Sequence, residues 1–175
     1  MPTTSKPAPS ILAIAPGARY LGFAAFADTE LVRFGVRSFP GKKTKASLRA
    51  QALALLEVLS RRHRPTILVV EDLFYREARQ SPLLHHLVLA LKKWGQDHKL
   101  KTVTYLPNVV KAHFCTGKKK TRPALAAAMV GRYWFLYSYL KPGRTQHYWR
   151  QMFDAVALGT LACEEHLRTS KARSS

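Results

Sequence analysis

The sequence predicts an α/β domain with a mixed five-stranded sheet, in which three antiparallel strands are followed by parallel strands and helices flank the sheet. Three runs rich in aromatic and branched residues, 11–16, 20–27 and 30–39, follow one another with only short turns between them. Two later apolar runs, 66–74 and 101–107, each come after a segment whose apolar residues recur at helical spacing. This order is typical of a mixed sheet covered by helices.

Five segments are predicted as helices. In the first, residues 47–63, Leu48, Leu55 and Leu59 recur at helical spacing. The other helices are predicted at residues 82–98, 108–115, 124–134 and 148–167, with an aromatic and Gly-Pro linker at 137–147. A single domain at 10–168 contains all these elements, and the polar ends, 1–9 and 169–175, are predicted to be disordered. The second helix has a wide apolar face, either core or a dimer interface, formed by Leu83, Leu84, Leu87, Leu91 and Trp94.

Positive charge dominates the composition. The chain has 29 Lys and Arg residues against 10 Asp and Glu, a formal net charge of +19. A folded domain with this imbalance repels itself, so the excess charge usually has a polyanionic partner. The basic residues are dispersed along the chain and not gathered on one amphipathic helix, which favours nucleic acid over a membrane surface. A charge that served only solubility would bring more acidic residues with it.

Targeting signals and cysteine motifs are both missing from the sequence. No apolar run has the length of a membrane-spanning helix, and the Pro-rich start lacks the apolar core of a signal peptide, so we expect a cytoplasmic protein. Cys115 and Cys163 have no CxxC or CxxH spacing. We therefore expect both to be small apolar residues and not zinc ligands or disulfide partners.

Two segments carry charge in a pattern that suggests chemistry. Glu71 and Asp72 interrupt the apolar run 66–74, which predicts a central strand with acids at its C-terminal end. The densest basic segment lies beside a predicted helix start, a position that favours phosphate. A solvated loop is the alternative for this segment, whose basic residues are Lys111, Lys118, Lys119, Lys120 and Arg122.

Four blocks of sequence together resemble RuvC-type Holliday-junction resolvases, a family of the RNase H-like superfamily. They are ILAIAPGARYLGFAAF (11–26), LVVEDLF (68–74), YLPNVVKAHFCTGKKKTRPALAAAMV (105–130) and FDAVALGTLA (153–162). The resemblance spans residues 11–167, and each block alone is weak. It implies an RNase H-like fold and Mg²⁺- or Mn²⁺-dependent cleavage of branched DNA in recombination and repair. It also implies a homodimer, which suits the two-fold symmetry of a four-way junction.

The acidic set that the resemblance implies is incomplete. The family places carboxylates at the end of the first strand, on the central strand and twice on the last helix, where they hold two metal ions. Glu71 and Asp154 match two of these positions, whereas Ala15 and Gln151 stand at the other two. We therefore expect weak metal binding at best and strongly impaired cleavage. The sequence leaves open whether Ala15 is natural or was introduced to trap a nuclease on its substrate.

The resemblance also implies a nucleic-acid surface. Phe74 matches an aromatic that wedges against bases at the junction, although a core phenylalanine is the alternative. Tyr75, Arg76 and Arg79 follow it, and arginine suits phosphate contact. The sequence thus favours a RuvC-like endonuclease that binds branched DNA with an incomplete catalytic set. The alternative is a non-catalytic module that recognises branched DNA or structured RNA, and a weaker one is a basic RNA-associated protein without junction preference.

Overall fold

The fold is a mixed five-stranded sheet with the strand order β3-β2-β1-β4-β5. The structure is a computed structural model and describes residues 9–117, 119–140 and 145–172. β1 pairs antiparallel with β2 and parallel with β4; β2 pairs antiparallel with β3, and β4 parallel with β5. This topology confirms the predicted fold class. The strands are Ser10–Ala15 (β1), Tyr20–Ala27 (β2), Glu30–Ser38 (β3), Ile67–Glu71 (β4) and Lys101–Tyr105 (β5).

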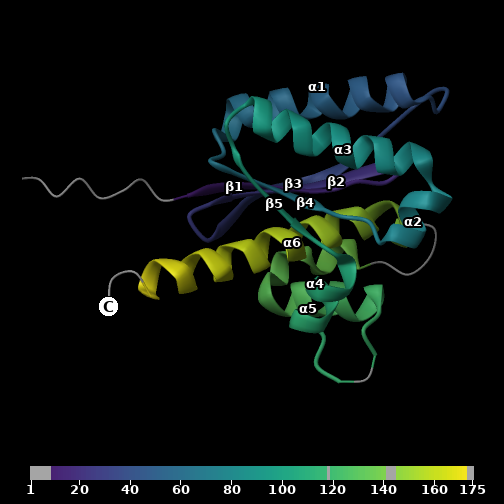
Figure 1. Cartoon of the computed structure of the whole chain (residues 1–175). Helices are drawn as coiled ribbons and strands as arrows, with labels where there is room; N and C mark the ends of the chain where they lie inside the picture. The colour runs from purple at the N-terminus through teal and green to yellow at the C-terminus, as the bar shows by residue number, and fades with distance from the viewer. Residues whose placement is uncertain (1–8, 118, 141–144, 173–175) are drawn as a thin grey trace, which may run out of the picture.

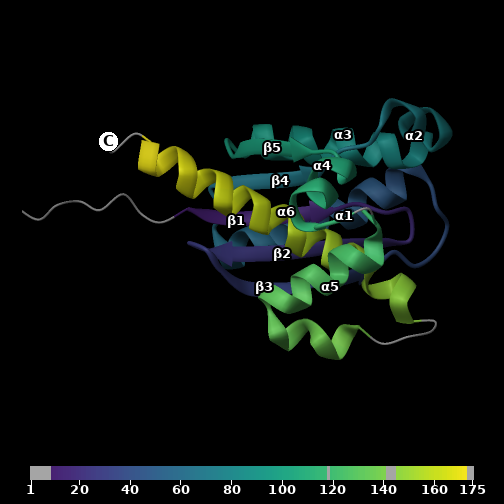
Figure 2. The ribbon, with the colours of Figure 1, turned by 90° about the horizontal axis from the view of Figure 1, so that it is seen from below.

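Helices cover both faces of the sheet (Figure 1). On one face, α1 (Lys45–His63) and α3 (Pro82–Asp97) pack on the side chains of Leu12, Ile14 and Leu68. On the other, α6 (Thr145–Ala172) crosses the sheet below β1 and β2, with α4 (Pro107–Phe114) and α5 (Arg122–Arg132) beside it (Figure 2). The alternation of buried residues along β1 and β4 sends odd-numbered side chains toward α6 and even-numbered ones toward α1 and α3.

The apolar face of α3 is core. Leu87, Leu91 and Trp94 are buried, and Leu83 and Leu84 pack against the same cluster. Of the two alternatives left open for this face, the structure thus supports the core. Cys115 and Cys163 are free, and both are buried, as expected of small apolar residues. Within the described ranges, no helix is both long and apolar enough to cross a membrane.

Two short helices were not predicted. The apolar run 66–74 is a strand only as far as Glu71, which lies at the C-terminal end of β4 as predicted, and α2 (Tyr75–Gln80) begins after Phe74. The last contact with β5 is the hydrogen bond from Asp72 N–H to the carbonyl of Tyr105, 2.9 Å long. The predicted linker begins too early, because a 3₁₀ helix, η1 (Trp134–Tyr139), continues the chain after α5. The last helix also extends beyond both predicted ends, 148 and 167.

A close approach between β2 and α6 fixes where the last helix crosses the sheet. A Cβ on Gly22 would lie only 1.9 Å from the carbonyl oxygen of Gln151, and one on Gly159 would lie 2.1 Å from the ring of Phe26. Real Cβ atoms do not approach so closely, so both positions require glycine. The contact holds the N-terminal half of α6 against the end of β1, which is where Gln151 and Asp154 lie.

Candidate functional site

Two buried carboxyl groups meet on the α6 side of the sheet. Glu71 is the last residue of β4, and its odd position in the strand alternation sends its side chain toward α6. Asp154 faces the sheet from α6, and the two residues are only 8% and 4% exposed. Burial, followed by the charge of Asp154, raises the pKa of Glu71 to about 8, and burial also raises the pKa of Asp154.

Cationic side chains surround this acid pair. Arg122, at the start of α5, lies with its Nε 3.6 Å from Oδ2 of Asp154. The charges of Arg122 and Lys111 partly offset the effect of burial, because they lower the pKa of both acids, and Arg150 does the same for Asp154. Lys111 and Arg122, which the sequence placed in one basic segment, are therefore brought to the acid pair. The protein thus places its own positive charge beside the pair, although burial still holds the pKa of both acids above its ordinary value.

Ala15 and Gln151 lie beside the acid pair, and neither carries charge. Ala15 is fully buried opposite Gly22, and the parallel register that pairs Ile14 with Val70 places the next residue, Ala15, beside Glu71. The side-chain amide of Gln151 packs against the turn after β1, with its Nε2 2.9 Å from the point where a Cβ on Gly17 would lie. Its Oε1 is buried and has no hydrogen-bond partner in the described part of the chain.

The residues at this position do not fit a two-metal centre. Two Mg²⁺ ions need several carboxylates that converge on them. Among the described residues, no group of three or more His, Cys, Asp or Glu side chains is placed to hold a metal ion. Arg122 instead forms an ion pair with Asp154, so an arginine lies beside the carboxylate where a metal ion would have to bind. No metal-dependent step follows from this arrangement.

The other nearby acids are engaged elsewhere. Asp72 points to the opposite face of the sheet, where its Oδ2 accepts from Nζ of Lys92 at 2.7 Å. Glu164 lies further along α6 and binds Nε2 of His113 at 2.6 Å and the guanidinium of Arg132. Neither carboxylate substitutes for Ala15 or Gln151, as the strand alternation and the helical rise predicted.

The remaining predicted nucleic-acid residues lie on segments that adjoin the acid pair. Phe74 is half-buried at the start of α2, where its backbone N–H donates to the Glu77 carboxylate at 3.3 Å. It is not among the described apolar side chains that pack against either core cluster, so the core alternative has no support. Tyr75 begins α2, but its side chain lies outside the described part, as does the whole of Lys118. The exposed basic side chains are Arg76 and Arg79 on α2 and Lys119 and Lys120 before α5.

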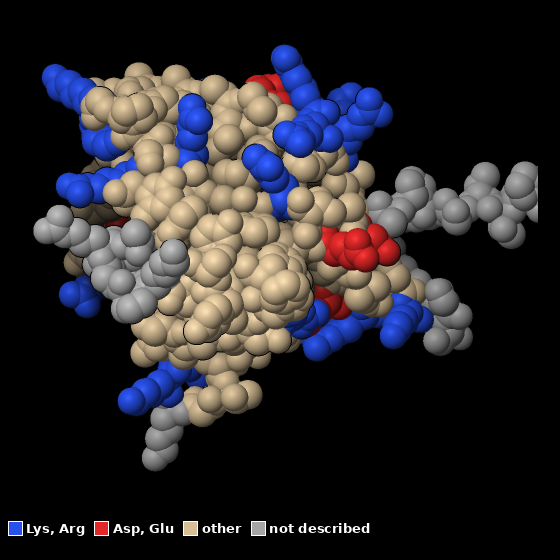
Figure 3. All heavy atoms as spheres, turned by 180° about the vertical axis from the view of Figure 1, so that it is seen from behind, with Lys and Arg blue, Asp and Glu red and all other residues tan. Residues whose placement is uncertain are grey.

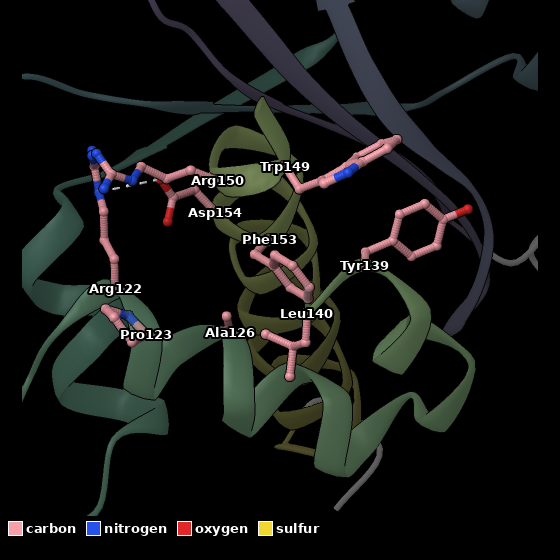
Figure 4. A pocket seen from close by; sticks show the side chains of 9 residues that line it. All are labelled: Arg122, Pro123, Ala126, Tyr139, Leu140, Trp149, Arg150, Phe153 and Asp154. Carbon is pink, nitrogen blue, oxygen red and sulfur yellow. Dashed lines mark ion pairs between the residues drawn. The ribbon is translucent and has the colours of Figure 1, made fainter. Parts of the chain in front are cut away.

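A pocket of about 100 Å³ opens beside Asp154, between α5, η1 and α6 (Figure 4). Its polar side is formed by Arg122, Arg150 and Asp154, and its apolar side includes Trp149 and Tyr139. Three of these residues were not predicted. Arg150 lies four residues before Asp154 and therefore on the same helix face, a spacing that is visible in the sequence. Tyr139 had no such signal, since its segment was predicted as linker.

The mixed sheet with its strand order β3-β2-β1-β4-β5 and its two helical layers define the RNase H-like fold. Within that class the architecture is that of RuvC-type resolvases. The T. thermophilus RuvC structure in complex with Holliday junction substrate superposes with a TM-score of 0.67 at 18% identity, covering 91% of this chain and 96% of that one. The yeast mitochondrial Holliday junction resolvase Ydc2 gives 0.62 at 13% identity, covering 99% and 87%. The fowlpox virus resolvase in complex with Holliday junction DNA gives 0.57 at 11% identity, covering 90% and 99%.

These similarities are similarities of fold. No known family model matches the chain, and no curated protein matches its sequence. The structural likeness confirms the fold that the four sequence blocks implied. At such low identity, the activity must be argued from the residues of this chain.

Proposed function

We propose that this protein binds branched DNA and does not cleave it. The observation that carries the proposal is the state of the acid pair. Glu71 and Asp154 are buried, and no third carboxylate joins them among the described residues. The cations beside them are the side chains of Arg122 and Lys111. The two acids thus lie where the resemblance places a nuclease centre. They do not supply the negative charge that a two-metal centre needs.

The distribution of charge and the fold support the choice of ligand. With a net charge of +19, the protein attracts a polyanion. On the face that Figure 3 shows, Lys and Arg side chains project from many parts of the outline, whereas Asp and Glu occupy small areas. Two proteins that share the fold, T. thermophilus RuvC and the fowlpox virus resolvase, have been solved with Holliday junction DNA. We therefore place a DNA branch point at the end of the sheet that carries the acid pair.

The proposal is tested by binding and cleavage with the same four-way junction. We expect tighter binding to the junction than to a matched duplex, single strand or RNA hairpin, and no cleavage with Mg²⁺ or Mn²⁺. The reason for the absence of cleavage is that two buried acids beside an arginine carry too little negative charge to hold two divalent ions. Equal affinity for all ligands would contradict junction recognition, and stronger binding to the RNA would favour structured RNA instead. Cleavage that Glu71→Gln abolishes would show that the centre is a working nuclease.

Phe74→Ala separates recognition of shape from attraction of charge. We expect the variant to weaken junction binding by about 1–3 kcal/mol and to leave duplex binding nearly unchanged, because an aromatic ring gains only where bases are already unstacked. Fluorescence anisotropy with both ligands measures the difference, after thermal melting has shown that the variant is folded. Equal losses of affinity for junction and duplex, or no loss, would show that Phe74 does not recognise the branch point.

Substitution of the exposed loop lysines tests the electrostatic part of binding. In the double variant Lys119→Ala/Lys120→Ala, the slope of log K against log salt should become shallower by up to about two phosphate contacts, since each contact contributes about −0.9. A double variant of Lys42 and Lys43, which are exposed in the loop before α1, gives the same change of charge away from α5. If both variants change the slope equally, the loop before α5 has no special role.

A further inference from the structure

The pocket between α5, η1 and α6 combines two kinds of wall. Figure 4 shows Arg122 and Arg150 extending to the same side, next to Asp154, while the rings of Trp149 and Tyr139 lie on the opposite side. The two rings meet edge to face, with centroids 4.6 Å apart. Phe153 and Leu140 lie between these two sides. The volume of about 100 Å³ is large enough for several water molecules.

The polar side of the pocket contains a buried side chain and does not consist of flexible surface residues alone. Asp154 lines it while only 4% exposed, and its carboxylate fixes Arg122 by the 3.6 Å ion pair. A guanidinium has five N–H donors, so this pair leaves others of Arg122 available to a ligand. Arg150 reaches the same region from the preceding turn of α6, and three cations, Lys111, Arg122 and Arg150, act on the single carboxylate of Asp154. The local charge therefore favours an anion.

The aromatic side of the pocket suits a flat ring on the same ligand as the anionic group. Trp149 and Tyr139 are both half-buried, so part of each ring remains available to the pocket. Aromatic rings bind nucleobases by stacking without regard to sequence. A phosphate suits the guanidinium groups, and a base suits the rings. A nucleotide carries both in one unit.

We propose that this pocket receives one unstacked nucleotide of the bound DNA, with its base against Trp149 and Tyr139 and its phosphate on Arg122 and Arg150. A base inside a duplex cannot enter, because it would first have to leave its stack, whereas a branch point or a single strand offers unstacked bases. The inference rests on the proposed function, and it adds a site distinct from Phe74, on the other helical layer of the molecule. It supplies a second reason for preference for branched over duplex DNA.

Photocrosslinking tests the site directly. Four-way junctions that carry one 5-bromodeoxyuridine at successive positions around the branch point are bound to the unmodified protein, irradiated and mapped by mass spectrometry. We expect crosslinks at Trp149 or Tyr139 from a position at the branch point and none from the matched duplex. The same protein is irradiated with a short bromodeoxyuridine-containing single strand as a second arm.

Variants on one helix provide the control. Arg150→Gln should weaken junction binding about tenfold or more and reduce the crosslink yield, since it removes a phosphate contact of the pocket. Arg168→Gln makes the same change of charge on an exposed position of α6, 18 residues and about 27 Å away along the helix, and should have much the smaller effect. Trp149→Phe should keep a crosslink at residue 149, whereas Trp149→Leu should lose it there while melting close to the unmodified protein. If Trp149→Leu does not fold, the two arginine variants still decide.

The outcomes separate the site from the proposed function. Junction-selective binding with crosslinks only outside the pocket overturns the pocket and leaves the proposed function intact. Absence of junction preference overturns the proposed function, and a crosslink from the single strand at Trp149 or Tyr139 then supports the pocket alone. Absence of crosslinks in both arms, or equal effects of Arg150→Gln and Arg168→Gln, overturns the pocket.

Discussion

Replacement of Ala15 with Asp is expected to lower the free energy of unfolding by about 3 kcal/mol or more when divalent metal is absent. Ala15 is fully buried at the end of β1 and lies beside Glu71 in the parallel register with β4. The new carboxyl group would share a buried site with Glu71 and Asp154. Negative charges repel one another strongly in a buried site. The added carboxyl group therefore either remains protonated or destabilises the fold.

Divalent metal should recover part of this loss. Three convergent carboxylates are a better ligand set than two, and any ion that binds only the folded state raises its stability in proportion to the logarithm of its concentration. Thermal melting in EDTA and in Mn²⁺ measures both effects. Ala15→Asn, which has nearly the same shape without the charge, is the control and should show no gain from Mn²⁺ beyond that of the unmodified protein. If Ala15→Asp melts like the unmodified protein under both conditions, position 15 does not lie beside the acid pair in the way described.

The parts of the fold that the sequence predicted well are those with local, periodic signals. The strands begin and end within two residues of the predicted limits, except at the C-terminal end of β4, because each shows an apolar run closed by turn residues. The two unpredicted elements lack such signals. η1 is held by the burial of Leu136 and by stacking of Phe135 on Phe34 of β3, a contact between distant parts of the chain. α2 is only six residues long, and no periodic pattern can be recognised over such a length.

The residues of the candidate site likewise fall into those with a local signal in the sequence and those without one. Glu71 and Asp154 were predicted because they match two acidic positions of the family that the sequence blocks resemble, and the structure brings both to one buried place. The ion pair of Asp154 with Arg122 depends on how α5 packs against α6, and no local pattern encodes that packing. Gln151 shows the point most clearly. Its spacing from Asp154 was visible, but its backbone contact with Gly22 follows from the crossing of α6 over β2.

Substitution of Glu71 with Gln is expected to change how stability depends on pH. Burial and the charge of Asp154 raise the pKa of Glu71 from 4.5 to about 8. Between these two values the folded protein binds a proton that the unfolded chain has already released. The stability contributed by protonated Glu71 is therefore complete below about pH 4.5 and is lost as pH rises toward 8. Gln carries no titrating group, so the variant lacks this loss.

The measurement compares the free energy of unfolding of both proteins by urea denaturation at pH 5 and pH 9 in EDTA. Since one pKa unit corresponds to about 1.4 kcal/mol, we expect the stability of the variant relative to the unmodified protein to increase by about 2–4 kcal/mol from pH 5 to pH 9. Glu30→Gln, at the exposed start of β3, removes the same charge from the surface and should leave the pH dependence nearly unchanged. Parallel curves for Glu71→Gln and the unmodified protein would mean that Glu71 is already ionised at pH 5. The cations around it would then outweigh its burial, and the acid pair would hold two negative charges that only Arg122 and its neighbours compensate.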